Sequence, residues 1–244
     1  MNYSIIIPCY NEEENIVILI EKLNAIYEEK EMQIVLVNNG STDKTLYVLE
    51  REAKKYPYIK IVDVKINQGY GYGLLKGLEN ADGEFVGWIH ADMQLDPSNL
   101  LRAISVLEKE ENPENVFIKG KRENRPFLDN LFTFGMSVFE TCLFKKRLYD
   151  IGAIPVIFHK SMISDIKFPP RDFAIELYVY YIAKSINKKI IRVPVNLGDR
   201  KAGKSSWNTG LLSKLRQSMR IIKASFKIKR NKIEKYLYSV EVNS

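Results

Sequence analysis

The fold is decided by residues 4–43, SIIIPCYNEEENIVILIEKLNAIYEEKEMQIVLVNNGSTD. Short runs rich in Ile and Val at the two ends of this segment predict buried strands from Tyr3 to Pro8 and from Gln33 to Asn38. Apolar residues at helical spacing between these runs predict a helix with one packed face, with Asn11 and Glu14 forming a capping box at its start. The packed face consists of Ile16, Leu19, Ile20, Leu23 and Tyr27. A strand, a helix and a second strand in this order favour a parallel pair.

The same alternation continues along the chain. Further strands are expected at Tyr58–Lys65, Glu84–His90, Asn115–Lys121, Ala153–His159 and Lys189–Val195, and helices at Phe127–Phe144 and Asp172–Asn187. We therefore expect an α/β fold with a mostly parallel sheet flanked by helices. Ligands of such sheets bind outside the carboxyl ends of the strands, so the segments that follow the strands are the candidate functional ones. These segments are PCYNEEEN (8–15), NNGSTD (38–43), NQGYGYG (67–73) and HADMQLDP (90–97).

The composition is that of a folded globular protein in a reducing compartment. The chain has 244 residues, of which 45% are hydrophobic and 27% charged, and two cysteines, Cys9 and Cys142. These cysteines lack the spacing of metal or redox sites, so we expect both to be small apolar packing residues. The longest apolar stretch, Leu131–Phe144, contains Glu140 and is too short to cross a bilayer. No secretion signal precedes the first predicted strand, so we expect a cytoplasmic protein.

Basic residues concentrate towards the C-terminus. The net charge is +7, and residues 201–244 alone contribute +9. A basic amphipathic helix is predicted here, with Leu211, Leu215, Met219, Ile222 and Phe226 on its apolar side. Either residues 207–230 lie on an anionic membrane surface, at the inner face of the plasma membrane, or the helix docks on the domain with its basic side chains in solvent. Nucleic acid is not an expected partner, because no reading module is visible and residues 1–200 are slightly acidic.

The segment His90-Ala91-Asp92-Met93-Gln94 follows the predicted strand EFVGWIH and carries the clearest chemical signal. Alternate side chains of an extended segment point the same way, so His90, Asp92 and Gln94 could converge on one ligand. A divalent cation suits these groups, because carboxylate and amide oxygens favour Mg²⁺ or Mn²⁺ and an imidazole favours Mn²⁺. The alternative is structural, with Asp92 capping a turn and His90 satisfied in the core.

The segment Asn38–Asp43 also has two interpretations. As a plain loop, it uses Gly40 for a tight turn, and Ser41 or Thr42 caps the next helix. As part of a binding site, it offers the side-chain oxygen of Asn39 to a ring N–H of uracil or guanine.

Three glycines, Gly69, Gly71 and Gly73, resemble a phosphate-cradling loop. Their spacing is not GxGxxG, however, and no Lys-Ser/Thr pair follows them. Close packing of a helix against a strand, with a turn at residues 67–69, is the favoured interpretation.

In combination, these segments resemble glycosyltransferase family 2, and within it the dolichyl- or polyprenyl-phosphate sugar synthases. The resemblance rests on SIIIPCYNEEENI, IVLVNNGSTDKT, NQGYGYGLLKGLENADGEF, HADMQLDP, KGKR and VPVNLGDRKAGKSS. It implies a GT-A fold over residues 1–205, in which residues 1–122 bind the nucleotide sugar and residues 123–205 form the acceptor side, followed by the tail 206–244. It also implies an inverting transfer from a nucleoside-diphosphate sugar to a membrane-linked acceptor, polyprenyl phosphate, with Mn²⁺ or Mg²⁺ as cofactor.

The resemblance also implies roles for individual residues. Asp92 and Gln94 would hold the metal against the diphosphate, with His90 in the place of the usual first aspartate. Arg122 and Arg200 would face the donor diphosphate or an acceptor phosphate. The candidate nucleotide-binding residues are Pro8, Tyr10, Glu12, Asn39, Gly69, Gly71 and Ala91. The chain departs from the family at Asn38-Asn39, where an acidic pair is usual.

The nature of the acceptor decides whether a catalytic base is needed. A phosphate oxygen is already anionic and needs only cationic guides, whereas a saccharide hydroxyl needs a general base within reach. The candidate bases are Asp172 and Glu176, four residues apart in a predicted helix. Alternatively, Asp172 caps that helix, and Glu176 is solvated or paired with Arg171 or Lys184.

Basic residues near the last motifs favour the phosphate acceptor. They are Arg122, Arg125, Arg200, Lys201 and Lys204. The alternatives are transfer to a saccharide hydroxyl in a surface polysaccharide or glycolipid, and a protein of another class that binds nucleotide sugars without catalysis.

Overall fold

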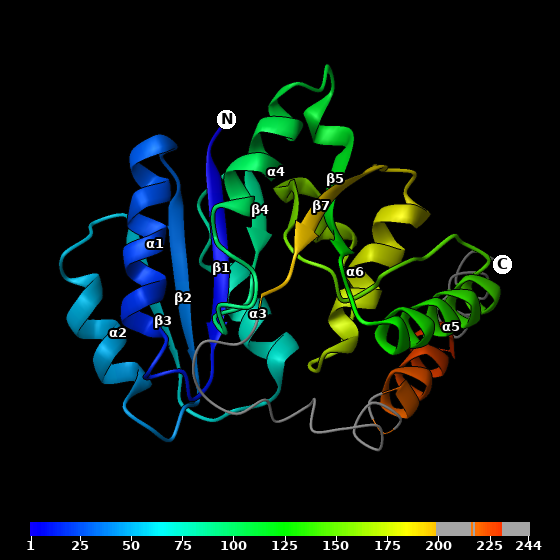
Figure 1. Ribbon diagram of the computed structural model, residues 1–244, viewed down its shortest axis with the longest axis horizontal. Helices are drawn as coiled ribbons and strands as arrows, with labels where there is room; N and C mark the ends of the chain where they lie inside the picture. The colour runs from blue at the N-terminus through cyan, green and yellow to red at the C-terminus, as the bar shows by residue number, and fades with distance from the viewer. Residues whose placement is uncertain (199–215, 217, 231–244) are drawn as a thin grey trace, which may run out of the picture.

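The computed structural model describes residues 1–198, 216 and 218–230. Its centre is a seven-stranded sheet in the order β3-β2-β1-β4-β6-β5-β7, flanked by helices (Figure 1). The strands are β1 (Tyr3–Cys9), β2 (Gln33–Asn39), β3 (Ile59–Val64), β4 (Phe85–Trp88), β5 (Val116–Glu123), β6 (Val156–His159) and β7 (Lys189–Asn196). The helices are α1 (Ile16–Glu29), α2 (Thr45–Ala53), α3 (Tyr70–Glu79), α4 (Asn99–Glu108), α5 (Phe127–Phe144) and α6 (Ala174–Ser185), with short 3₁₀ helices at Pro113–Asn115 and Lys160–Asp165. Residues 218–230 are also helical. The predicted mostly parallel α/β fold is confirmed.

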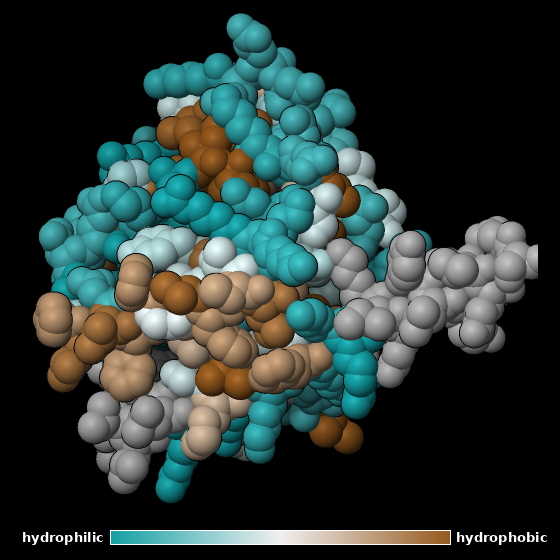
Figure 2. Space-filling view, turned by 90° about the vertical axis from the view of Figure 1, so that its right-hand side faces the viewer, coloured by the Kyte–Doolittle hydropathy of each residue, from teal (hydrophilic) through white to brown (hydrophobic). Residues whose placement is uncertain are grey.

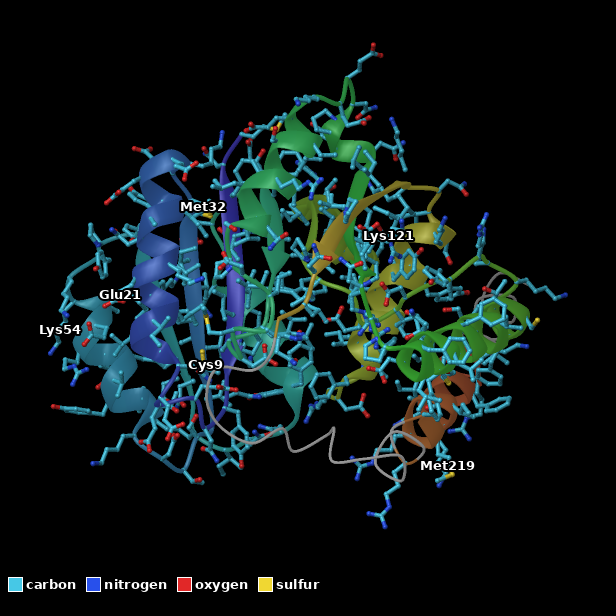
Figure 3. The ribbon with its side chains drawn as sticks, in the orientation of Figure 1. Cys9, Glu21, Met32, Lys54, Lys121 and Met219 are labelled. Atoms are coloured by element: carbon cyan, nitrogen blue, oxygen red, sulfur yellow. The ribbon has the colours of Figure 1, made fainter. Side chains whose placement is uncertain are left out.

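The direction of the strands brings most of their carboxyl ends to one edge of the sheet. β1 pairs with β2 and β4, β2 with β3, and β5 with β7, all in parallel. Only β6, among the described strands, runs antiparallel to its neighbours β4 and β5. In Figure 3, Cys9 marks the carboxyl edge and Met32 the amino edge. The central strands are buried along nearly their whole length, as expected for Ile- and Val-rich strands covered on both faces.

The first helix begins later than its sequence predicts. α1 starts at Ile16, and Asn15 occupies its N-cap position. The prediction that Asn11 caps it is wrong, because Asn11 has a positive φ of 54° and its side-chain oxygen accepts a hydrogen bond from the Thr42 N–H at 2.8 Å. This side chain joins two loops instead of capping a helix. Ile26, and not the half-buried Tyr27, completes the buried face of α1.

The start of α2 also differs from the one that the sequence predicts. The helix begins at Thr45, and Asp43 Oδ1 accepts a hydrogen bond from the Thr45 N–H at 2.9 Å. Ser41 and Thr42 therefore do not cap it. Ser41 Oγ accepts instead from the Asn11 N–H at 3.1 Å, which again joins the loops after β1 and β2.

Other differences are small. β4 ends at Trp88, two residues before the predicted end, and α6 is shorter by two residues at each end. Cys9 is buried as predicted, but Cys142 is exposed on α5, so the expectation that it is a packing residue is wrong. Within the described residues, no helix has the length and apolar character needed to span a bilayer. The proposed boundaries at residues 122 and 205 stay predictions.

Candidate functional site

Hydrogen bonds tie the loops at the carboxyl edge of the sheet into one unit. The loops after β1 and β2 are joined by Asn11, as described above. The Asn39 amide group at the end of β2 donates to the Gly69 carbonyl oxygen, just before α3, at 3.1 Å. The Gly198 N–H, two residues beyond β7, donates to the Gln94 carbonyl oxygen at 2.8 Å. The predicted binding segments therefore lie at one edge of the fold.

Side chains of the segment after β4 alternate between the core and the surface. Ala91, Met93 and Leu95 are buried. His90, Asp92 and Gln94 are each partly exposed, although the strand has already ended and Met93 has a positive φ of 59°. The expected alternation is thus present at the carboxyl edge.

The donor atoms of these three side chains are of the types that divalent cations take as ligands. His90 Nε2 is buried and has no hydrogen-bond partner in the described part of the chain. Asp92 uses Oδ1 to accept from the Gln94 N–H at 3.2 Å, a turn contact of the kind predicted as the structural alternative. Asp92 Oδ2 and the Gln94 amide oxygen remain as oxygen donors of the kind that Mg²⁺ and Mn²⁺ prefer. No group of three or more His, Cys, Asp and Glu side chains suited to a metal occurs in the described part of the chain.

A buried polar cluster lies directly behind this segment. Glu176 Oε1 accepts hydrogen bonds from Trp88 Nε1 at 2.7 Å and from Tyr70 Oη at 3.0 Å. The Tyr70 ring meets the His90 ring edge-on, with 5.5 Å between centroids. Burial, followed by the negative charge of Glu176, raises the pKa of Tyr70 well above its ordinary value, so this hydroxyl stays protonated and keeps donating.

Lys119 closes the far side of the same cluster. Its side chain is fully buried, donates to the Ala153 carbonyl oxygen at 2.9 Å, and lies 3.9 Å from Glu176 Oε2. Burial lowers the pKa of Lys119 to about 8, against the opposing effect of Glu176. Glu176 is only 4% exposed. The pairing of Glu176 with Arg171 or Lys184, and its solvation, are therefore wrong alternatives, because Lys119 is its cationic neighbour and the core encloses it.

Asp172 lies outside this cluster and acts as a helix cap. It is exposed, and its Oδ1 accepts a hydrogen bond from the Ala174 N–H, at the first residue of α6, at 3.0 Å. Asp172 and Glu176 thus do not form a pair of carboxylates on one accessible face.

Among the candidate nucleotide-binding residues, Asn39 has the most informative surroundings. It is 3% exposed, and its amide nitrogen is engaged by Gly69 while its Oδ1 has no partner in the described residues. A buried amide oxygen without a donor favours a ligand that brings an N–H. The neighbouring Asn38 is already engaged, because its Oδ1 accepts from the Ser41 N–H at 3.3 Å and its amide nitrogen donates to Asp63 Oδ1 at 2.7 Å.

The other candidates around β1 differ in accessibility. Pro8 is half-buried in β1 and Tyr10 is 48% exposed immediately after it. Glu12 is buried, and its Oε2 accepts from Asn15 Nδ2 at 2.5 Å. Ala91 is buried between His90 and Asp92. Tyr10 is thus the candidate of this group that presents a side chain to solvent.

Gly69 and Gly71 pack against another segment of the chain. A Cβ on Gly69 would lie 2.3 Å from the Arg171 carbonyl oxygen, and one on Gly71 would lie 2.6 Å from the Pro170 carbonyl oxygen. Gly69 also has a φ of 108°, a conformation that other residues rarely adopt. Gly69 and Gly71 thus pack closely against the loop before α6 and not against a strand, whereas a Cβ on Gly73 would lie 2.6 Å from Asn39 Cγ on β2, as the prediction of helix-to-strand packing requires.

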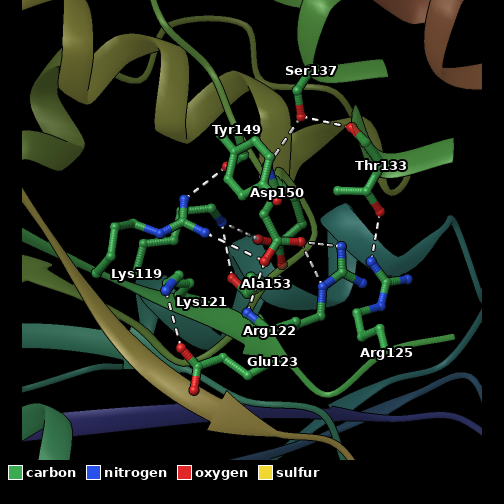
Figure 4. Close-up of polar contacts among 12 residues, drawn as sticks. Lys119, Lys121, Arg122, Glu123, Arg125, Thr133, Ser137, Tyr149, Asp150 and Ala153 are labelled. Carbon is green, nitrogen blue, oxygen red and sulfur yellow. Dashed lines mark hydrogen bonds and ion pairs between the residues drawn. The ribbon is translucent and has the colours of Figure 1, made fainter. Parts of the chain in front are cut away.

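Arg122 belongs to a cationic cluster around a buried carboxylate (Figure 4). Its Nε donates to Asp150 Oδ1 at 2.6 Å, and Arg192 Nη2 donates to Asp150 Oδ2 at 3.4 Å. Burial alone would raise the pKa of Asp150, but the Arg122 guanidinium group outweighs it and holds the pKa below its ordinary value. Two guanidinium groups share one carboxylate, so the cluster keeps a net positive charge. Arg125 lies nearby and donates to Thr133 Oγ1 at 2.6 Å.

Sequence reasoning missed Asp150, Arg192, Lys119 and Tyr70. Lys119 and Tyr70 stand in the segments KGKR and NQGYGYG, and Asp150 and Arg192 lie outside every motif, but the partners of all four come from elements distant in sequence. The charge of Lys119 within the apolar strand VFIKGKR was the one available signal, because a lysine in a buried strand needs a partner. Arg200, Lys201 and Lys204 lie outside the described residues.

Comparison with known proteins identifies the family. Residues 4–153 match glycosyl transferase family 2. The chain belongs to this family. It is 27% identical to a dolichol-phosphate mannosyltransferase from Pyrococcus furiosus over 84% of this chain and 59% of that protein. It is 26% identical to a dodecaprenyl-phosphate galacturonate synthase from Rhizobium johnstonii over 68% of this chain and 50% of that protein. The resemblance to the polyprenyl-phosphate branch is thus confirmed, while the chain spans only half to three fifths of these relatives' length.

Solved structures agree with the fold. Glucosyl-3-phosphoglycerate synthase from Mycobacterium tuberculosis, in complex with Mn²⁺, uridine-diphosphate-glucose and phosphoglyceric acid, has a TM-score of 0.71 to this chain at 15% identity. The match covers 93% of this chain and 79% of the synthase. The GT-A fold expected from the motifs is therefore confirmed.

Proposed function

We propose that the protein transfers a sugar from a nucleoside diphosphate to a polyprenyl phosphate, with inversion at the anomeric carbon. One observation carries this proposal: His90, Asp92 and Gln94 are the partly exposed side chains of residues 90–94, at the edge where the buried Asn39 Oδ1 has no hydrogen-bond partner among the described residues. This arrangement offers metal ligands for a diphosphate and a hydrogen-bond acceptor for a base. The activities named for both relatives agree with it.

The proposed residue roles follow from the geometry. Asp92, Gln94 and His90 would hold a divalent cation, and the cation would supply charge neutralisation at the leaving diphosphate. Asn39 would accept a hydrogen bond from the base. Tyr10 is the exposed ring that follows β1, the strand paired with the β2 strand of Asn39. Arg122, with Arg192, would supply positive charge on the acceptor side.

The reaction needs no proton transfer in this form. An oxygen of the acceptor phosphate attacks the anomeric carbon while the bond from that carbon to the nucleoside diphosphate breaks, and the electron pair leaves with the diphosphate. The enclosure of Glu176 supports this acceptor, because a carboxylate that Trp88, Tyr70 and Lys119 surround is poorly placed to take a proton from a sugar hydroxyl.

Calorimetry tests the donor half of the proposal. Titration with UDP, GDP and their sugars should show binding that strengthens when Mn²⁺ is present and weakens in Asp92→Asn. Absence of any metal-dependent nucleotide binding would reject the enzyme function.

A transfer assay tests the acceptor half. Product should form with a polyprenyl phosphate, and Asp172→Asn should retain turnover, because Asp172 is a helix cap. Loss of turnover in either Asp172→Asn or Glu176→Gln, with intact donor binding, would favour a saccharide hydroxyl as acceptor. Donor binding without product, when both lipid and glycan acceptors are offered, would favour a non-catalytic nucleotide-sugar-binding protein.

We also propose a place at the inner face of the plasma membrane, supported by the lipid acceptors named for the relatives and by the basic C-terminal sequence. The predicted helix at residues 211–226 lies partly outside the described residues. In its described part, Met219 and Phe226 are more than half exposed.

A further inference from the structure

One face of α5 is apolar and open to solvent. Its large hydrophobic side chains with exposures between 47% and 79% are Phe127, Leu128, Leu131, Phe134 and Val138. Successive intervals of four, three and four residues separate Phe127, Leu131, Phe134 and Val138, so these four side chains share one side of the helix. We call this set of five residues the α5 apolar face. Figure 2 looks at the side of the molecule that carries α5, and hydrophobic residues gather in the lower half of that view.

A different side of α5 packs against the rest of the molecule. Ser137, Glu140 and Phe144 are its buried residues. The helix at 218–230 contacts α5 through Ser225 Oγ, which donates to Glu140 Oε1 at 2.6 Å, and through the rings of Phe139 and Phe226, with centroids 5.9 Å apart. The α5 apolar face is therefore separate from this contact. Soluble proteins rarely leave a contiguous apolar patch of this kind without a partner.

Exposed basic residues lie next to α5, beyond its C-terminal end and on the helix that packs against it. Lys145 and Arg147 are exposed immediately after the C-terminal end of α5. Lys223, Lys227 and Lys229 are exposed on the helix that packs against α5. The acidic residues of α5 are Asp129 and Glu140, and Glu140 is fully buried. An apolar strip with a basic border is complementary to a bilayer with anionic headgroups.

The position of α5 connects this surface with the candidate site. α5 begins four residues after β5 ends, so it starts at the carboxyl edge of the sheet. Arg122 lies on β5, the strand that leads into α5, and its partner Asp150 lies in the loop that follows α5. A lipid phosphate at the level of the α5 apolar face would thus lie on the same side of the molecule as the acceptor charges.

We propose that the α5 apolar face is the surface by which this protein docks on an anionic lipid bilayer. The five apolar side chains enter the boundary between headgroups and acyl chains, and the lysines and arginine around them contact lipid phosphates. This docking rests on the proposed function, because it would bring the protein to the membrane that holds a lipid-linked acceptor. It assigns membrane contact to α5 in addition to the C-terminal sequence.

Vesicle sedimentation of the full chain, without any sugar donor, tests the docking. The vesicles contain phosphatidylcholine and phosphatidylglycerol, and the variants are Leu131→Glu and Phe134→Glu. Both positions are exposed, so neither change removes a core contact. Tyr47→Glu on α2 is the matched control, because Tyr47 is 62% exposed and α2 lies at the opposite end of the molecule (Figure 1).

We expect the wild type and Tyr47→Glu to bind the vesicles, and each α5 variant to lose about tenfold or more in partitioning. Unchanged partitioning in both α5 variants, or an equal loss in Tyr47→Glu, would overturn the proposal. So would a wild-type dimer in solution that fails to bind vesicles and dissociates in the α5 variants, since the face would then join two copies of the chain.

The native cysteines allow a second measurement. Cys142 is exposed and lies four residues after Val138, on the same side of α5, whereas Cys9 is buried. A polarity-sensitive dye on Cys142 should shift its emission to shorter wavelength when anionic vesicles are added, and much less with pure phosphatidylcholine. An unchanged emission with both vesicle types contradicts the proposal.

Two acceptors separate this proposal from the proposed function. The α5 variants should keep transfer to a short, water-soluble prenyl phosphate and lose transfer to a long-chain polyprenyl phosphate in vesicles. Vesicle binding without transfer to either acceptor would refute the function and leave the docking surface intact. Transfer to vesicle-borne acceptor that is equal in the wild type and the α5 variants would refute the docking surface.

Discussion

Asn39 is the residue proposed to contact the nucleotide base. Its buried Oδ1 accepts no hydrogen bond from the described residues, and an N–H from uracil or guanine would supply one. We predict that Asn39→Ala weakens nucleotide binding about fivefold to tenfold, the equivalent of about one net hydrogen bond. Calorimetry with UDP and GDP measures this loss. Asn38→Ala is the control, because Asn38 already contacts Asp63. An equal loss in both variants would mean that the loop, and not the Asn39 oxygen, determines affinity.

Lys119 gives a second prediction at the residue scale, in the pH dependence of stability. Burial lowers its pKa to about 8, whereas the ordinary value is 10.5. Between these two values the unfolded chain binds more protons than the folded chain, so the free energy of unfolding should rise with pH. Urea denaturation from about pH 8 to 10 should show this rise in the wild type and a flatter curve in Lys119→Met. The exposed neighbour Lys121 provides the control, and Lys121→Met should keep the wild-type slope.

Single residues were predictable where local pattern decides their position. The exposure of His90, Asp92 and Gln94 follows from alternation after a buried strand, and capping by Asp172 follows from its place before a helix. The enclosure of Glu176 was not predictable, because three of its partners, Trp88, Tyr70 and Lys119, come from three other elements. Likewise, Asp150 is distant in sequence from Arg122 and Arg192, and no local pattern joins them.

The contact between α5 and the helix at 218–230 gives a prediction at the scale of elements. Burial raises the pKa of Glu140 to about 7, and its ordinary value is 4.5. Between these values the folded chain binds more protons, so this contribution to stability is present at low pH and is lost as pH rises through about 7. We predict that Glu140→Gln raises the free energy of unfolding relative to the wild type by more at pH 8 than at pH 5. The two differences should themselves differ by at most about 3 kcal/mol. Thermal unfolding at the two pH values measures this change. Glu50→Gln, at an exposed position on α2, should show no such difference.

Most helices and strands were predictable from the sequence, whereas the starts of two helices and the direction of one strand were not. α5 has the predicted bounds, because Phe127–Phe144 is a continuous apolar pattern after Pro126. The starts of α1 and α2 were missed because Asn11 and Ser41 bond to each other's loops, and a sequence does not show which of two partners a polar side chain will take. The antiparallel direction of β6 was also missed, since apolar alternation is the same in both directions.

At the scale of the whole molecule, the uneven distribution of positive charge should decide how strongly the protein binds anionic membranes. Basic residues cluster at the end of the chain where the helix at 218–230 packs on α5, while Lys54 marks the distant end (Figure 3). We predict that replacing Lys223, Lys227 and Lys229 with Gln weakens binding to anionic vesicles by up to about 100-fold at low salt, at about 1 kcal/mol for each charge. The effect should shrink at high salt, because the charges are exposed and screened.

A matched variant tests whether location matters as well as net charge. Replacing Lys44, Lys54 and Lys60 with Gln removes the same number of charges from exposed positions elsewhere. Sedimentation at two ionic strengths should show a much smaller effect for this set. Equal effects of the two sets would mean that overall charge alone controls the association.

In an enzyme of the proposed kind, the bond from the Gly198 N–H to the Gln94 carbonyl oxygen would couple the binding of the two substrates. It fastens the exit of β7 to the segment that carries Asp92, so a displacement of either segment strains the other. Thermodynamic linkage makes such coupling reciprocal. Bound donor should therefore raise the affinity for the acceptor by the same factor by which bound acceptor raises the affinity for the donor. A kinetic scheme in which the two substrates bind independently would then not describe turnover.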